Sequence, residues 1–115
     1  MGKREQVLAR KLQKNLDGIR ATVKRRSSSR DRAQRKVNEY RAGITEERAK
    51  LERAEISGNT VLIEQAEGYL KEYEDQVEKW EAKYKEDQEA IDSRQSKIDA
   101  ITSSLDTLKS RGLLK

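Results

Sequence analysis

Apolar residues recur at alternating steps of three and four through most of this 115-residue chain, and no other feature restricts its fold so strongly. This spacing places apolar side chains along one face of an α-helix. It is the heptad pattern of coiled coils, in which the a and d positions meet a partner helix. The chain contains no proline that would interrupt a long helix. In the first half the d row is Leu12, Ile19, Arg26, Ala33, Tyr40, Glu47 and Ala54, and the a row is Leu16, Val23, Arg30, Val37, Ile44 and Leu51.

The second half repeats the heptad pattern in a different phase. Leu51 and Ile63 are twelve residues apart, which is neither a whole number of heptads nor one of the usual insertions. One continuous helix would therefore turn the two apolar rows to different faces. The a row is Ile63, Leu70, Val77, Tyr84, Ile91, Ile98 and Leu105, and the d row is Ala66, Tyr73, Trp80, Asp87, Arg94, Ile101 and Leu108.

A turn at the segment Ile-Ser-Gly-Asn-Thr, residues 56–60, would account for this change of heptad phase. Glycine accepts the left-handed conformation that ends many helices, and Asn or Thr side chains cap the next helix. We expect Gly58 to end a first helix over about 4–56, and Asn59 or Thr60 to begin a second over about 61–110. The turn is predicted at 57–60, Gly112 is expected to end the second helix, and residues 1–115 are treated as one domain.

Folding the chain back at this turn gives an antiparallel pairing in which Leu16 faces Ile101. The same register sets Arg30 opposite Asp87 and Ala33 opposite Tyr84. Small residues then oppose large ones, which keeps the separation of the helices even. The predicted fold class is all-α, a long antiparallel two-helix coiled-coil hairpin. Because two helices bury little surface, two such hairpins can also pair into a helical bundle.

The composition restricts the chemistry open to this chain. Apolar residues make up 33% and charged residues 41%, and there is no cysteine and no histidine. Disulfides, thiolate chemistry and the commonest general base are therefore excluded. No catalytic, cofactor-binding or metal-binding constellation is recognisable, so we expect a protein that is not an enzyme. The sequence shows no secretion signal and no membrane-spanning stretch, which favours a cytoplasmic or intravirion location without a membrane partner.

The positive charge is concentrated in the first half. Residues 1–54 carry a net charge of +10 and residues 55–115 a net charge of −5. A basic segment over 20–36 could bind the phosphates of RNA or DNA without reading their sequence. The alternative is a solvated face that the acidic second helix neutralises. No aromatic residue interleaves with the segment, so base stacking is not expected there. The candidate phosphate-binding residues are Arg20, Lys24, Arg25, Arg32, Arg35 and Lys36.

Two further groups of residues stand out on the predicted seam. Charged residues interrupt its middle, either as a device that fixes the register or as a hinge or docking site for a partner. These polar seam residues are Arg26, Arg30, Asp87 and Arg94. An aromatic group follows, with Tyr73, Trp80 and Tyr84 on the seam and Tyr69 beside it, where a further helix could pack.

The function that these features favour is structural. A coiled-coil hairpin would present its helical faces to partner proteins, or to copies of itself, in a larger complex. The alternative is sequence-independent binding of RNA or DNA through the basic first helix. A third hypothesis is a small regulator or chaperone that opens its seam to hold partner helices.

Overall fold

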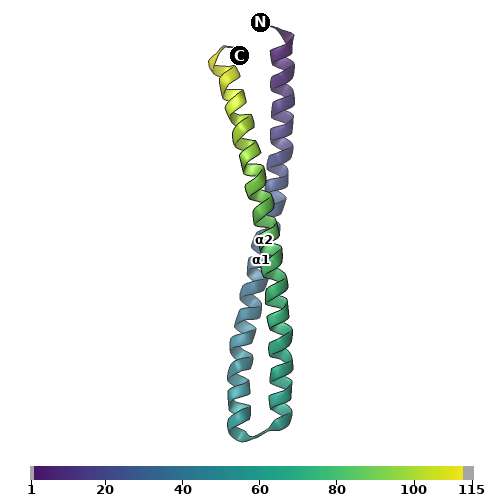
Figure 1. Cartoon of the computed structure of the whole chain (residues 1–115), viewed down its shortest axis with the longest axis vertical. Helices are drawn as coiled ribbons and strands as arrows, with labels where there is room; N and C mark the ends of the chain where they lie inside the picture. Colours follow the sequence, from purple (N-terminus) through teal and green to yellow (C-terminus); the bar gives the residue numbers. More distant parts are fainter. Residues whose placement is uncertain (1, 113–115) are drawn as a thin grey trace. The chain divides into compact units, whose positions relative to one another are not determined.

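The computed structural model describes residues 2–112, and within that range it contains two α-helices and no strand (Figure 1). Helix α1 spans Lys3–Ser57 and helix α2 spans Thr60–Ser110. The predicted all-α two-helix hairpin is confirmed. The expected helix ends at 4, 56, 61 and 110 each lie within one residue of the observed ends. Met1 and residues 113–115, which the predicted domain included, lie outside the described residues.

The turn between the helices is built as the sequence predicts. Gly58 has a φ of 66°, which is the left-handed conformation. Its N–H donates to the carbonyl of Glu55 at 3.1 Å, and the N–H of Asn59 donates to the carbonyl of Ala54 at 3.0 Å. These two hydrogen bonds form a Schellman motif, which satisfies the last carbonyls of α1.

Asn59 begins α2 as its N-cap. The side-chain Oδ1 of Asn59 accepts a hydrogen bond from the N–H of Leu62 at 3.1 Å, and its carbonyl accepts one from Ile63 at 3.0 Å. One N–H group of the first turn of α2 thereby gains a side-chain acceptor. Of the two capping residues that the sequence allowed, Asn59 is the one used. At the other end of α2, Gly112 also has a positive φ, of 68°.

The chain divides into two compact units, each of which contains part of both helices. Unit 1 combines Met1–Ser28 with Asp87–Lys115, and unit 2 is Ser29–Glu86. Unit 2 contains the turn and the segments of α1 and α2 that flank it. Unit 1 contains the start of α1 and the end of α2.

The apolar seam is confirmed by burial. Every residue of the four predicted rows is buried or half-buried, including the charged ones. In unit 2 the rings of Tyr40 and Tyr73, from opposite helices, lie with their centroids 5.8 Å apart. A Cβ on Gly43 would lie 3.1 Å from two ring carbons of Tyr73. The absent side chain at Gly43 thus lets this aromatic ring lie close to the backbone of α1.

The hydrophobic core is thin. In the described residues the buried apolar side chains are Ala9, Leu16, Ala33, Val37, Ile44, Ala54, Ala66, Ile91 and Ile98. Four of these nine are alanines, which contribute little apolar area. The largest side chain that is fully buried is a carboxylate, that of Asp87. Burial within this hairpin therefore supplies only a modest driving force for holding its helices together.

Because Gly58 has a left-handed conformation and Gly68 does not, replacing glycine with alanine should have opposite effects on the free energy of unfolding at these two positions. Gly58→Ala should lower the free energy of unfolding by about 1 kcal/mol, because a Cβ disfavours positive φ. Gly68→Ala, at an exposed position inside α2 where a Cβ meets nothing within 4 Å, should raise it by about 0.5–1 kcal/mol. Urea unfolding followed by circular dichroism measures both. Equal stabilisation by the two variants would contradict this structure of the turn.

Candidate functional site

The six candidate phosphate-binding residues all lie on α1, and the structure divides them between the two units. Arg20, Lys24 and Arg25 belong to unit 1, and Arg32, Arg35 and Lys36 belong to unit 2. Five of the side chains are exposed, and only Lys36 is half-buried. The helix therefore presents most of this charge to solvent, as a phosphate-binding surface requires.

None of these six cations pairs with a carboxylate of α2 in the described structure. Arg25 donates a hydrogen bond to the hydroxyl of Thr22 at 3.1 Å, and Lys36 pairs at 3.6 Å with Glu39 of its own helix. Arg32 contacts an aromatic ring instead of an acid. The ion pairs that join the helices within each unit are made by other residues, Arg26 with Asp87 and Arg41 with Glu81. Within the basic segment, Arg26 is therefore paired directly with α2, whereas the six candidate phosphate-binding cations have no such pair in the described structure.

The polar seam brings a cation of α1 to the buried carboxylate of Asp87. The predicted register places Asp87 opposite Arg30, with Arg26 in a neighbouring layer. In the structure Arg26 Nη1 donates to Asp87 Oδ1 at 3.0 Å, with Asp87 fully buried. Arg26 lies one helical turn before Arg30, and a guanidinium is long enough to reach along the seam beyond its own layer.

The other two members of the polar seam also have hydrogen bonds within their own helices. Arg30 Nε and Nη2 donate to Asp31 at 3.3 and 3.2 Å. Arg94 Nη1 donates to the carbonyl of Ala90 at 3.1 Å. Both residues are half-buried, so their aliphatic stems cover the seam while their charged ends find polar partners. These hydrogen bonds hold charge inside a seam that would otherwise be apolar.

An aromatic side chain lies beside the basic segment, which corrects the sequence-based expectation. The Arg32 guanidinium lies 5.7 Å from the ring centroid of Trp80, and the Lys79 ammonium lies 5.4 Å from it. The indole Nε1 of Trp80 is buried and has no hydrogen-bond partner. Sequence proximity could not show this contact, because the ring comes from the opposite helix. The predicted register pairs Trp80 with Val37, the residue that follows the basic segment. This register could have indicated that the ring lies close to Arg32.

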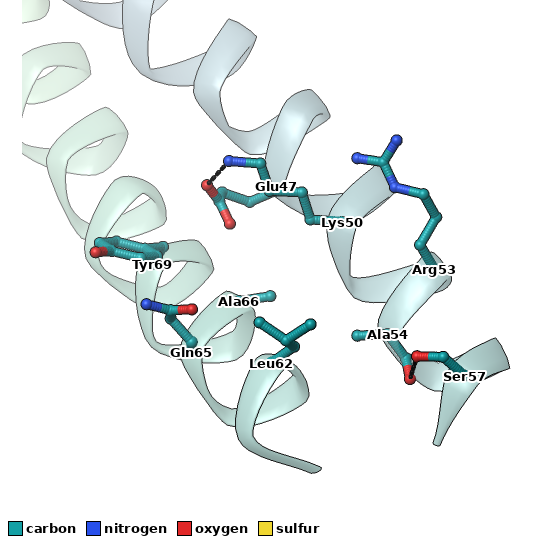
Figure 2. A pocket seen from close by; sticks show the side chains of 9 residues that line it. All are labelled: Glu47, Lys50, Arg53, Ala54, Ser57, Leu62, Gln65, Ala66 and Tyr69. Carbon is teal, nitrogen blue, oxygen red and sulfur yellow. Dashed lines mark hydrogen bonds and ion pairs between the residues drawn. The ribbon is translucent and has the colours of Figure 1, made fainter. Parts of the chain in front are cut away.

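A second candidate site is a hollow of about 700 Å³ between α1 and α2 beside the turn (Figure 2). Ala54 of α1 and Leu62 and Ala66 of α2 give it apolar walls, and Tyr69 closes one side. The small side chains at positions 54 and 66 leave this space open. Of the lining residues, Tyr69 was the one expected from the sequence to lie beside the seam, where a further helix could pack. The off-seam apolar residues on both sides of Gly58 were a further sequence signal for this site.

A buried acid and its cation form the polar side of this hollow. Glu47, only 7% exposed, accepts a hydrogen bond at Oε1 from Lys50 Nζ at 3.3 Å. This bond, with Coulombic attraction to Glu47 and Glu46, raises the pKa of Lys50 above its ordinary value. Lys50 therefore stays protonated at neutral and mildly alkaline pH. Arg53 adds a second cation to the lining.

The described residues contain no group of three or more acidic side chains placed to hold a metal ion. No helix in the described part of the chain is long and apolar enough to cross a membrane. Comparison with known protein families, with curated proteins and with solved structures finds no match.

The buried pair in unit 1 predicts a large difference between two acidic residues. Asp87→Ala should lower the free energy of unfolding by about 2–3 kcal/mol, because it leaves Arg26 in the seam without this carboxylate. Glu81→Ala should cost less than about 1 kcal/mol, because its pair with Arg41 is exposed. Urea unfolding measures both variants.

A double substitution separates the charge from the packing at this position. Arg26→Met with Asp87→Leu should recover most of the stability lost in Asp87→Ala, because buried ion pairs are often replaceable by apolar residues. Equal costs for Asp87→Ala and Glu81→Ala would show that the buried pair does not contribute to stability.

Proposed function

We propose that this chain is a non-enzymatic assembly protein, acting in a cytoplasm or a virion, whose hairpin associates with other helices. The observation that supports this most directly is apolar surface that the hairpin leaves uncovered around its turn. Ile56 is 81% exposed, Val61 is 73% exposed, and Leu62 and Tyr69 are also exposed. We call these four residues the tip surface. Together with the thin core, this surface indicates a hairpin that gains stability when another helix covers it.

A second copy of the chain is the partner that the tip surface fits best. The same surface carries both protruding apolar side chains and the hollow beside the turn, so two copies related by a two-fold axis could fill each other's hollows. The hollow is lined by the cations Lys50 and Arg53, and exposed Glu64 and Glu67 lie on α2 nearby. Opposite charges are thus available on the same surface for a self-complementary contact.

Removing apolar side chains from the tip surface should weaken self-association. The double variant Leu62→Gln with Tyr69→Gln should raise the dissociation constant of the dimer by roughly a hundredfold, which corresponds to about 3 kcal/mol of lost burial. Size-exclusion chromatography with light scattering over a dilution series measures this. The matched control is Val7→Gln with Leu8→Gln, which changes two comparably exposed apolar residues in unit 1.

Two results would contradict self-assembly through the tip surface. One is a wild-type protein that stays monomeric at every concentration. The other is a control variant that dissociates as readily as the tip variant, since that would place the contact in unit 1.

Binding of RNA or DNA is a second candidate function, supported by a different observation. Among the described residues, the six candidate phosphate-binding cations of α1 form no ion pair with a carboxylate of α2, so their charge remains available to an external polyanion. Phosphates that replace small counterions on such a surface bind through charge, with little dependence on base sequence.

Salt dependence tests the phosphate-binding proposal. Replacing Arg25, Arg32, Arg35 and Lys36 with Gln should weaken binding equally for unrelated sequences and flatten the salt slope by up to about one unit per lost contact. A control with the same loss of charge replaces Lys71, Lys85, Lys97 and Lys109 of α2 and should retain most of the affinity. Fluorescence anisotropy of a labelled oligonucleotide provides the measurement. Absence of binding even at about 50 mM salt would exclude this function.

A further inference from the structure

A hollow of about 460 Å³ in unit 2 lies beside Trp80 and takes its polar groups from both helices. Ser29 and Arg32 come from α1, and Lys79 and Lys83 come from α2. Ser29 and Arg32 lie in the part of the basic segment that belongs to unit 2. The hollow therefore extends the predicted phosphate-binding surface of α1 onto a residue of the acidic half, Lys79.

The groups around Trp80 have more donors than acceptors. The guanidinium of Arg32 and the ammonium of Lys79 lie over the ring, and neither pairs with a carboxylate in the described structure. The buried Nε1 of Trp80 has no acceptor either. The carboxylate among the lining residues, that of Glu86, already lies 4.0 Å from Lys83. An anion would supply the acceptor that the two cations on the ring do not find within the protein.

The ring makes a nucleotide a better ligand than a phosphate alone. Nucleic-acid bases stack on aromatic side chains and Arg guanidinium planes, and cations beside the ring attract the phosphates. Arg32 and Lys79 now occupy positions over the ring, so a phosphate that draws one of them aside would leave ring surface for the base. Bases in a duplex are already stacked and paired, so only a single strand offers one freely.

We infer that Trp80, Arg32 and Lys79 form a binding site for a nucleotide of single-stranded RNA or DNA. The phosphate binds Arg32 and Lys79, and the base stacks on the indole of Trp80. This inference rests on the second candidate function, nucleic-acid binding, and assigns it an aromatic site that the basic segment of α1 does not contain.

Trp80 is the only tryptophan in the chain, so its fluorescence reports directly on this site. Titration with a short oligothymidylate at low salt should quench its emission, because a stacked base lies against the indole. Separate titrations use the same oligonucleotide in a duplex with oligoadenylate, inorganic polyphosphate, and polyglutamate. We expect the single strand to bind at least about fivefold more tightly than each of them, the lower bound for one stacked base.

Variants separate stacking from charge when binding is followed by anisotropy of a labelled oligothymidylate. Trp80→Leu should weaken binding by about tenfold, whereas Trp80→Phe, which retains an aromatic ring, should recover most of the loss. Arg32→Gln and Lys79→Gln should each weaken binding several-fold. The matched control, Lys71→Gln, removes one exposed cation of the same helix outside the hollow and should change affinity little. Circular dichroism confirms that each variant remains helical.

Several outcomes would overturn the inference. Oligothymidylate binding that leaves the Trp80 emission unchanged would exclude stacking, as would equal affinities of Trp80→Leu and the wild type. Equal binding of polyphosphate or polyglutamate would reduce the site to charge alone, and a preference for the duplex would exclude recognition of an unpaired base. In each of these cases salt-dependent binding through α1 could still stand, which distinguishes failure of this site from failure of the wider function. Absence of binding by every probe would overturn both.

Discussion

The contact between two apolar helical rows is the constraint on which this hairpin depends. Neither helix can remove its seam from water without the other, because a single amphipathic helix leaves one face exposed. The turn makes this contact intramolecular. Gly58 ends α1 in the left-handed conformation and Asn59 caps α2, so the chain reverses with its backbone hydrogen bonds satisfied. Every residue of the predicted rows is buried or half-buried as a result of this arrangement.

The thinness of that contact has a functional consequence. Alanines make up much of the buried apolar set, and a fully buried aspartate lies on the seam. Near the turn, Ala54 and Ala66 leave a hollow, while Ile56 and Val61 remain in water. A hairpin built in this way leaves apolar surface that its own two helices do not cover. The proposal of an assembly role depends on this surface and not on any catalytic group.

Charge has separate roles on the seam and on the surface. Arg26 and Asp87 pair inside unit 1, where burial makes each dependent on the other. The cations at Arg20, Lys24 and Arg35 have no such partner and face solvent. The first group can affect stability and register, whereas the second is the group on which the proposal of nucleic-acid binding depends. One basic segment of sequence thus contains residues of both kinds.

The sequence determined the helices, the turn and the seam. These features depend on local conformational preference and on a repeat whose period is that of the helix, and both can be read from residue order. Gly58 could be identified in this way because few residues tolerate positive φ.

Only the tertiary structure decided which side chains from opposite helices meet. The heptad register places residues in layers, but long side chains reach beyond their own layer. Arg26 therefore reaches the carboxylate of Asp87 from a neighbouring layer, and Arg32 lies over Trp80. The hollow beside the turn likewise depends on how closely two particular helices approach at Ala54 and Ala66. Such distances depend on how the two helices pack together, so they cannot be predicted from either half of the sequence alone.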